Sequence, residues 1–278
     1  MGKADAQQSF VDLMQLREEA SDVWAGMSPL YPWGRVYGGL VVAQGLRAAY
    51  ATVAAAYRIH SLHAYFIRSG THEEPIRYEV DRVRDGRSFA TRRVLARQSS
   101  GTILNLSASF QIDERDVAVQ LAELPSALPE PKACPRSQWT PHLETRIIPA
   151  LTERSGRAAA WIRIADCPTD DPILQDCGIA YASDELPMIA AMRAHPGRPD
   201  SLDAEPSDFF YCASLDHALW FHRAGRADQW MLHDVECHGL GSARGLTLAR
   251  LFARDGAHFA TLAQECLIRS PQADVPQR

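Results

Sequence analysis

Two stretches of the first half alternate apolar and polar residues with a period of two, at residues 62–67 and 104–110. This alternation is typical of β-strands with one buried face. An Asp-Gly pair at 85–86 and a Ser-Gly pair at 100–101 lie between strand-like runs and indicate hairpin turns. The pattern therefore predicts an antiparallel sheet.

A helix is predicted where the period changes, in the run YGGLVVAQGLRAAYATVAAAY at residues 37–57. Because this run is almost wholly apolar, the helix should lie buried against the sheet. Gly45 inside it costs roughly 1 kcal/mol relative to Ala, so we expect another backbone to pass close by. A shorter amphipathic helix is predicted over residues 9–20, with Phe10, Leu13 and Met14 among its contacts.

The second half follows the same order of elements. AAAWIRIAD at 158–166 predicts a strand, the segment at 171–195 predicts helices, and FFYCASLDHALWFHR at 209–223 opens another series of strands. The Arg-Asp-Gly-Ala turn at 254–257 repeats the chemistry of the first hairpin. Helices followed by antiparallel strands in each half predict an α+β fold.

The two halves also resemble each other in sequence. HSLHAYFIRSG at 60–70 and CASLDHALWFHRAG at 212–225 share Ser-Leu, a His, an aromatic-rich apolar segment, a basic residue and a Gly turn. This suggests a duplication, with domains at residues 1–112 and 158–278. Residues 113–157 are rich in prolines and acidic residues and are interpreted as a connector that crosses the outside of the structure.

Composition narrows the class of protein. The 278 residues are 46% hydrophobic and 23% charged, and the formal net charge of −5 argues against a nucleic-acid binder. The N-terminus lacks the apolar core of a signal peptide, and no apolar run is long enough to span a bilayer. The six cysteines show no CxxC pair, so reduced thiols are expected. We expect a cytoplasmic protein without membrane insertion.

Seven segments together resemble the type II acyl-CoA thioesterases. They are VYGGLVVAQ (36–44), HSLHAYFIRSG (60–70), RDGRSFATRRV (84–94), SASFQ (107–111), YASD (181–184), SLDHALWFHR (214–223) and AQECLIR (263–269). The resemblance implies two tandem hot-dog domains, each an antiparallel sheet wrapped around a central helix. It also implies an acyl-CoA substrate, no metal or other cofactor, and a homodimer or homotetramer.

The resemblance places the catalytic residues in the second half, at Asp184 in YASD, Ser214 in ASLDH and Gln264 in AQECL. Bacterial members have Thr where this chain has Ser214, and Ser keeps the hydroxyl. A thioester carbonyl is electrophilic and its thiolate is a good leaving group, so a positioned water suffices. Asp184 would act as general base, an effect typically worth about 10²–10⁴-fold. The Ser hydroxyl and the Gln amide would orient the water and the carboxylate.

Each of these residues also has an ordinary structural interpretation. Asp184 precedes ELPMIAAM, where an acidic residue often caps a helix. Ser214 taken alone is a strand serine. Gln264 breaks an apolar alternation, which costs stability unless its amide is hydrogen-bonded. Asp216 and His217 are adjacent on a predicted strand and should face opposite sides, so we interpret His217, like His63, as structural, at a subunit or domain contact.

Six arginines form a basic run in the first half, at Arg82, Arg84, Arg87, Arg92, Arg93 and Arg97. They are interpreted as a solvated sheet face, some of which could meet the phosphates of coenzyme A. Two other functions stay open. A hot-dog enoyl-CoA hydratase needs a His/Asp pair facing the pocket, and a non-catalytic acyl-CoA-binding protein binds without turnover.

Overall fold

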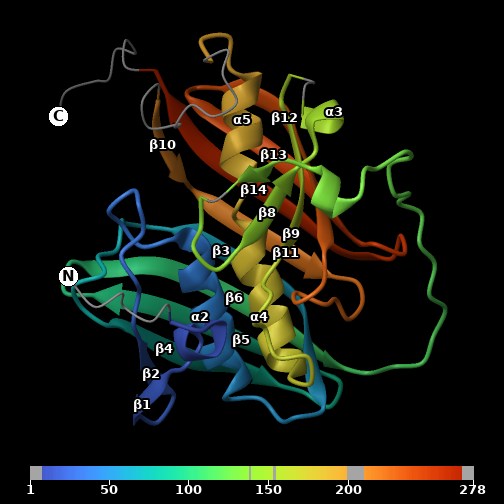
Figure 1. The fold of residues 1–278 in the computed structure, drawn as a ribbon. Coiled ribbons are helices and arrows are strands. Elements are labelled where there is room, and N and C mark those ends of the chain that lie inside the picture. The colour runs from blue at the N-terminus through green and yellow to red at the C-terminus, as the bar shows by residue number, and fades with distance from the viewer. Residues whose placement is uncertain (1–7, 138, 153–154, 199–209, 271–278) are drawn as a thin grey trace, which may run out of the picture.

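The structure is a computed structural model that describes residues 8–137, 139–152, 155–198 and 210–270 (Figure 1). The strands of the first half are β1 (Arg17–Ala20), β2 (Val23–Gly26), β3 (Tyr57–Phe66), β4 (Ile76–Asp85), β5 (Phe89–Gln98) and β6 (Gly101–Ile112). The following strands are β7 (Arg136–Ser137), β8 (Glu144–Ile147), β9 (Arg157–Arg163), β10 (Tyr211–Ser214), β11 (Asp216–Phe221), β12 (Met231–Gly241), β13 (Arg244–Ala253) and β14 (His258–Arg269).

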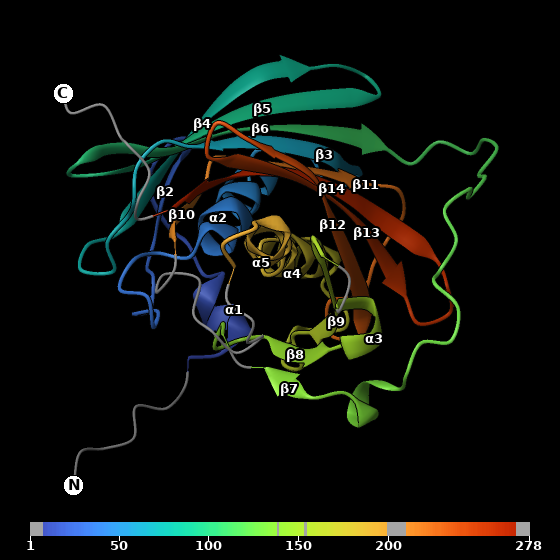
Figure 2. The same cartoon turned by 90° about the horizontal axis from the view of Figure 1, so that it is seen from above.

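The α-helices are α1 (Phe10–Leu13), α2 (Gly38–Tyr50), α3 (Pro149–Thr152), α4 (Pro172–Ser183) and α5 (Pro187–Ala194), and a 3₁₀ turn η1 covers Pro131–Ala133. The strands of the described residues form one sheet in the order β1-β2-β4-β5-β6-β3-β11-β14-β13-β12-β9-β8-β7, and β10 pairs with β14. The sheet curves around α2, α4 and α5 (Figure 2). None of the helices in the described segments is long and apolar enough to cross a bilayer.

Helix α2 is the buried helix that the apolar run predicts. It packs against α4 on one side and against strands β5 and β6 on the other. The expectation for Gly45 is wrong, because a Cβ there would meet only the side chains of Leu106 and Tyr78, at 3.8 and 3.9 Å. The close backbone approach occurs at Gly39 instead, where a Cβ would lie 2.4 Å from the Tyr181 carbonyl oxygen of α4.

The amphipathic helix predicted over residues 9–20 is wrong beyond its first turn. Phe10, Leu13 and Met14 are buried as expected, and α1 ends at Leu13. Residues 17–20 form β1 and all four are exposed. Because Arg-Glu-Glu-Ala offers no apolar face to continue the helix, the segment pairs with β2 as an edge strand.

The two duplicated strands pair directly with each other at the seam between the halves. Strand β3 runs antiparallel to β11, with Leu62 opposite Leu219 and Ala64 opposite His217. The first copy reads Ser-Leu-His and the second Ser-Leu-Asp-His, and a one-residue shift turns a side chain to the other face of a sheet. His63 is accordingly exposed, whereas His217 is fully buried. The two histidines are therefore not equivalent.

The predicted turns are confirmed at residues 85–86, 100–101 and 254–257, which join β4 to β5, β5 to β6 and β13 to β14. Residues 113–130 carry no regular element and run outside the sheet (Figure 2), whereas β7 and β8 extend the sheet beyond β9. The domain boundaries stay a prediction. All six cysteines are free thiols, and five of them are buried.

Candidate active site

Asp184 lies at the junction between α4 and α5, immediately after the last residue of α4. The capping interpretation is wrong, because α5 begins after Leu186 and receives no side-chain cap. The Asp184 carboxylate instead accepts hydrogen bonds from the Gln264 amide, at 2.9 Å, and from the backbone N–H of Gly39. The Asp184 side chain is therefore part of a site that residues of other segments complete.

The N-terminus of α2 faces this carboxylate. A Cβ on Gly38 would lie 2.6 Å from Asp184 Oδ2 and 3.0 Å from the Phe66 ring, so a side chain at this position would displace the carboxylate. The N-terminus of a helix carries a partial positive charge that favours an anion. The N-terminus of α2, in the first half of the chain, thus stabilises the negative charge of Asp184 in the second half.

Ser214 and Gln264 come to Asp184 from paired strands. Ser214 ends β10 opposite Cys266 of β14, which places Gln264 diagonally across from it. Gln264 Nε2 donates to Ser214 Oγ at 2.9 Å and to Asp184 Oδ1 at 2.9 Å, and Ser214 Oγ lies 3.4 Å from the same carboxylate oxygen. All three residues predicted from the resemblance are within hydrogen-bond reach of one another.

His217 adds a contact that sequence reasoning missed. Its Nδ1 lies 2.5 Å from Gln264 Oε1, and its Nε2 lies 2.9 Å from Ser183 Oγ. The sequence predicted a structural role for His217 at a subunit or domain contact, and it did not predict this contact with Gln264. A buried amide on an inward-facing strand position needs a polar neighbour on the same face, and His217 is the cross-strand candidate that this rule could have indicated.

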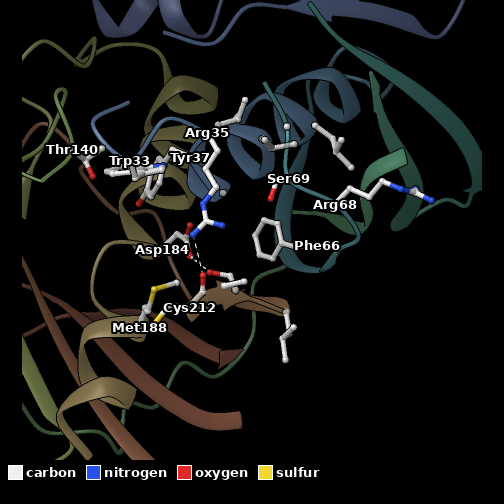
Figure 3. A pocket seen from close by; sticks show the side chains of 18 of the residues that line it. Trp33, Arg35, Tyr37, Phe66, Arg68, Ser69, Thr140, Asp184, Met188 and Cys212 are labelled. Atoms are coloured by element: carbon white, nitrogen blue, oxygen red, sulfur yellow. Dashed lines mark hydrogen bonds between the residues drawn. The ribbon is translucent and has the colours of Figure 1, made fainter. Parts of the chain in front are cut away.

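A cavity of about 400 Å³ opens beside Asp184 and Ser214. Its apolar lining comes from both halves: Val36, Val41, Phe66, Ile103, Met188 and Ile189. Arg35 and Arg68 also line it, and Arg35 extends toward Asp184 in Figure 3. Arg35 donates to the carbonyl oxygen of Cys212 at 2.9 Å. Within the described residues, neither arginine forms an ion pair.

Burial dominates the electrostatics of the site. Desolvation raises the pKa of Asp184 above its usual value, and the hydrogen bonds from Gln264, Gly39 and Ser214 oppose that shift. Burial likewise lowers the pKa of His217 and so favours the neutral imidazole. The neighbouring Glu185 also lines the cavity, and burial raises its pKa to about 7 although Thr140 hydrogen-bonds to it.

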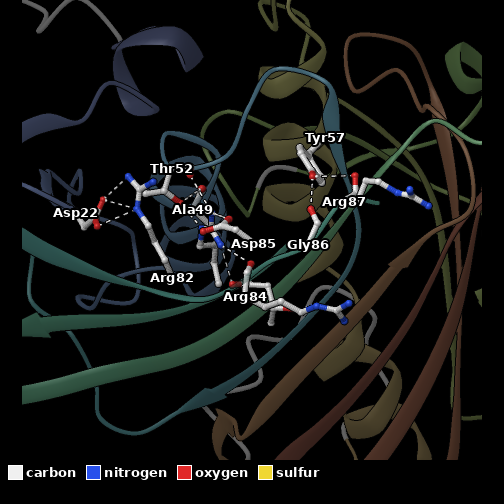
Figure 4. Close-up of polar contacts among 11 residues, drawn as sticks. Asp22, Ala49, Thr52, Tyr57, Arg82, Arg84, Asp85, Gly86 and Arg87 are labelled. Atoms are coloured by element: carbon white, nitrogen blue, oxygen red, sulfur yellow. Dashed lines mark hydrogen bonds and ion pairs between the residues drawn. The ribbon is translucent and has the colours of Figure 1, made fainter. Parts of the chain in front are cut away.

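The basic run of the first half does not line this cavity. Arg82, Arg92, Arg93 and Arg97 are each paired with an acidic side chain: Asp22, Asp85, Asp81 and Glu79, respectively. Figure 4 shows the pair of Arg82 with Asp22. A fully solvated face is wrong for Arg92, which is 1% exposed and donates to the side-chain and backbone oxygens of Thr52. The sheet period turns this one arginine inward.

Two family models match the chain. The acyl-CoA thioesterase N-terminal domain matches residues 28–111, and the acyl-CoA thioesterase C-terminal domain matches residues 119–268. Together they cover most of the sequence.

Individual proteins are similar over nearly their whole length. Acyl-CoA thioesterase 2 of Haemophilus influenzae is 31% identical, covering 96% of this chain and 99% of that protein. The crystal structure of an acyl-CoA thioesterase II, TesB2, from Mycobacterium marinum is 34% identical, with a TM-score of 0.82 over 95% of this chain and 99% of that one. A hot-dog protein of Alicyclobacillus acidocaldarius, at 18% identity and a TM-score of 0.77 over 94% of this chain and 98% of that one, shares the fold. The predicted double hot-dog architecture is confirmed.

Proposed function

Because this chain belongs to the type II acyl-CoA thioesterase family, we propose that it hydrolyses fatty acyl-CoA to free acid and coenzyme A. A water molecule activated by Asp184, Ser214 and Gln264 attacks the thioester directly. The observation that carries this mechanism is the convergence of a carboxylate, a hydroxyl and an amide, from three separate segments, beside one cavity.

The reaction needs one proton acceptor and one oriented nucleophile. The water oxygen bonds to the thioester carbonyl carbon while Asp184 takes a water proton. The carbon–sulfur bond then breaks, and the coenzyme A thiolate leaves and takes up the proton held by Asp184, which returns to its carboxylate form. The side-chain hydrogen bonds from Gln264 and Ser214 both end on Oδ1, and we assign the water proton to Oδ2, which receives no side-chain hydrogen bond from the described residues. Burial raises the pKa of Asp184 and makes it a stronger base than an exposed aspartate.

The cavity suits the two parts of this substrate. Its apolar side chains, which include Phe66, Ile103 and Met188, offer a surface to a fatty acyl chain. Arg35 and Arg68 bring two guanidinium groups without carboxylate partners among the described residues, and arginine is well suited to phosphate. We assign them to the phosphates of coenzyme A, in place of the arginine run at residues 82–97.

A hydratase would need a histidine that faces the cavity. No histidine of the described residues lines the cavity. His217 is fully buried behind Gln264, with both ring nitrogens engaged. A His/Asp pair facing the substrate is therefore missing, which favours hydrolysis over hydration.

The direct test is release of free thiol from acyl-CoA esters of short to long chains by the purified protein. We expect turnover at some chain length. Folded protein that releases no thiol from any of them would overturn the proposal, and calorimetric binding of acyl-CoA without turnover would indicate the non-catalytic binding protein instead.

Gln264→Ala tests the assigned residues. Losing the amide leaves the carboxylate and the hydroxyl without a common partner, so kcat should fall by about 100-fold or more. The control is Gln111→Ala, which removes a glutamine that is only partly buried from the closing strand β6 of the first half. The control should keep normal turnover. Near-normal turnover of folded Gln264→Ala would refute the role.

A further inference from the structure

The side-chain amide of Gln264 points its NH₂ group toward Asp184 and Ser214. Its two N–H groups meet two acceptors, Asp184 Oδ1 and Ser214 Oγ, each at 2.9 Å. A rotation of the amide by 180° would bring its oxygen against the carboxylate, and both acceptors would lose their donor. The orientation is fully satisfied only if a neighbour also donates to the amide oxygen.

His217 is that neighbour. Its Nδ1 lies 2.5 Å from Gln264 Oε1, and because Oε1 is only an acceptor, Nδ1 must carry the hydrogen. A neutral imidazole protonated at Nδ1 presents Nε2 as an acceptor. Ser183 Oγ lies 2.9 Å from Nε2 and also 2.9 Å from the carbonyl oxygen of Ala180, so these two acceptors share its single hydrogen.

The side chains that form these hydrogen bonds are buried away from solvent. His217 and Gln264 are both 0% exposed, and Ser183 is 1% exposed. Neither His217 nor Gln264 lines the cavity, so substrate does not touch the imidazole. The hydrogen bonds that orient the amide run from His217 Nδ1 to Gln264 Oε1, and from Gln264 Nε2 to Asp184 and Ser214.

We propose that His217 is a positioning residue, which holds the side-chain amide of Gln264 with its NH₂ group turned toward Asp184 and Ser214. This inference rests on the proposed hydrolysis only for its kinetic consequence. The donor on Nδ1 itself is a property of the folded protein and can be observed without substrate.

The kinetic test compares His217→Leu with His217→Asn. Leu removes the donor, so kcat should fall by about 10- to 100-fold while KM changes by less than about threefold. The Asn side-chain amide can donate from near the Nδ1 position, so His217→Asn should recover most of kcat. His63→Leu, on the paired strand β3 and exposed, is the control and should behave as wild type. Normal kcat in folded His217→Leu would overturn the proposal.

A double-mutant cycle separates positioning from general loss of structure. If His217 acts through Gln264, His217→Leu should lower kcat little further in a Gln264→Ala background. An equal fold-loss in both backgrounds would overturn the proposal. If His217→Leu does not fold, Ser183→Ala takes its place in the cycle, because it removes the hydroxyl at Nε2 and leaves the imidazole present.

The third test determines which ring nitrogen of His217 carries the hydrogen. Long-range ¹H–¹⁵N correlation spectra of the wild-type protein, with the His217 signals assigned by their loss in His217→Asn, should show a neutral ring protonated at Nδ1. Protonation at Nε2 alone would mean that the amide presents its NH₂ group to His217, and would overturn the proposal. This result stands even if the protein hydrolyses no thioester, so the two proposals fail separately.

Discussion

Asp184 and Glu185 are consecutive buried acids whose surroundings differ. Burial raises the pKa of both, but Asp184 receives hydrogen bonds from an amide, a hydroxyl and a backbone N–H. Among the described residues, Glu185 receives hydrogen bonds only from hydroxyls, those of Thr140, at 2.5 Å, and of Thr145. At the residue scale, therefore, the carboxylate with the amide and backbone donors is the one assigned to catalysis.

The raised pKa of Glu185 predicts a dependence of stability on pH. With a usual value of 4.5 and a folded value of about 7, the protonated form stabilises the fold fully below 4.5, and this contribution is lost as the pH rises to about 7. In the Glu185→Gln variant the side chain is an amide and does not titrate. Its free energy of unfolding should therefore rise relative to wild type between pH 5 and pH 8, by on the order of 1–3 kcal/mol.

Urea unfolding at the two pH values measures this difference. Glu236→Gln removes an exposed glutamate and serves as the control, and its effect on stability should be small and equal at both values. A Glu185→Gln difference that is also independent of pH would contradict the assignment.

At the scale of elements, α2 has two glycines with opposite roles. Gly39 sits where the Tyr181 carbonyl of α4 leaves 2.4 Å for a Cβ, whereas Gly45 would make only ordinary side-chain contacts at 3.8 Å and beyond. Backbone atoms cannot move aside as a flexible side chain can. The two helices can approach this closely because position 39 is glycine.

We predict that Gly39→Ala destabilises the fold by about 1–3 kcal/mol, because the helices must separate. Gly45→Ala, on the same helix, should raise the free energy of unfolding by up to about 1 kcal/mol, since alanine is the better helix former. Thermal and urea unfolding measure both variants. Equal effects of the two substitutions would show that the close approach does not limit α2.

The elements differ in how far sequence predicts them. The apolar run of α2 and the period-two strands were predictable because each carries its own pattern over six or more consecutive residues. The end of α1 was missed because Phe10, Leu13 and Met14 fit a helix, and only the pairing of residues 17–20 with β2 shows that it stops.

At the scale of the whole molecule, one buried cluster ties three segments across the two halves. Asp176 of α4 accepts from Tyr50 of α2 at 2.5 Å and from Arg58 of β3 at 2.6 Å. The carboxylate is 5% exposed, and burial raises the pKa of Asp176 while Arg58 opposes the shift. The guanidinium therefore balances a charge that the interior disfavours.

Arg58→Met should lower the free energy of unfolding by about 2–4 kcal/mol at pH 7.5, because it leaves a buried carboxylate unpaired. The deficit should shrink toward pH 5, since a carboxyl with a raised pKa then takes up a proton in the folded state. Urea unfolding at both pH values measures it. Arg93→Met breaks an ion pair whose side chains are each 54% exposed, and should cost about 1 kcal/mol or less. A deficit that does not vary with pH would contradict this account.

Three expectations about the whole protein stay predictions: the homodimer or homotetramer, the cytoplasmic location, and the domain boundaries with a connector at 113–157.

The sequence by itself determined the α+β class, the duplication, and the oddity of an amide at Gln264 in an apolar strand, because these follow from residues that are neighbours along the chain. The resemblance supplied Asp184 and Ser214. Only the tertiary structure decided that Asp184 does not cap a helix, that His217 faces inward against Gln264, and that Arg35 lines the cavity while Arg92 does not. These depend on contacts between residues 30 to 80 positions apart, such as those of Asp184 with Ser214 and Gln264, and strand register and helix packing set such contacts, whereas local pattern does not.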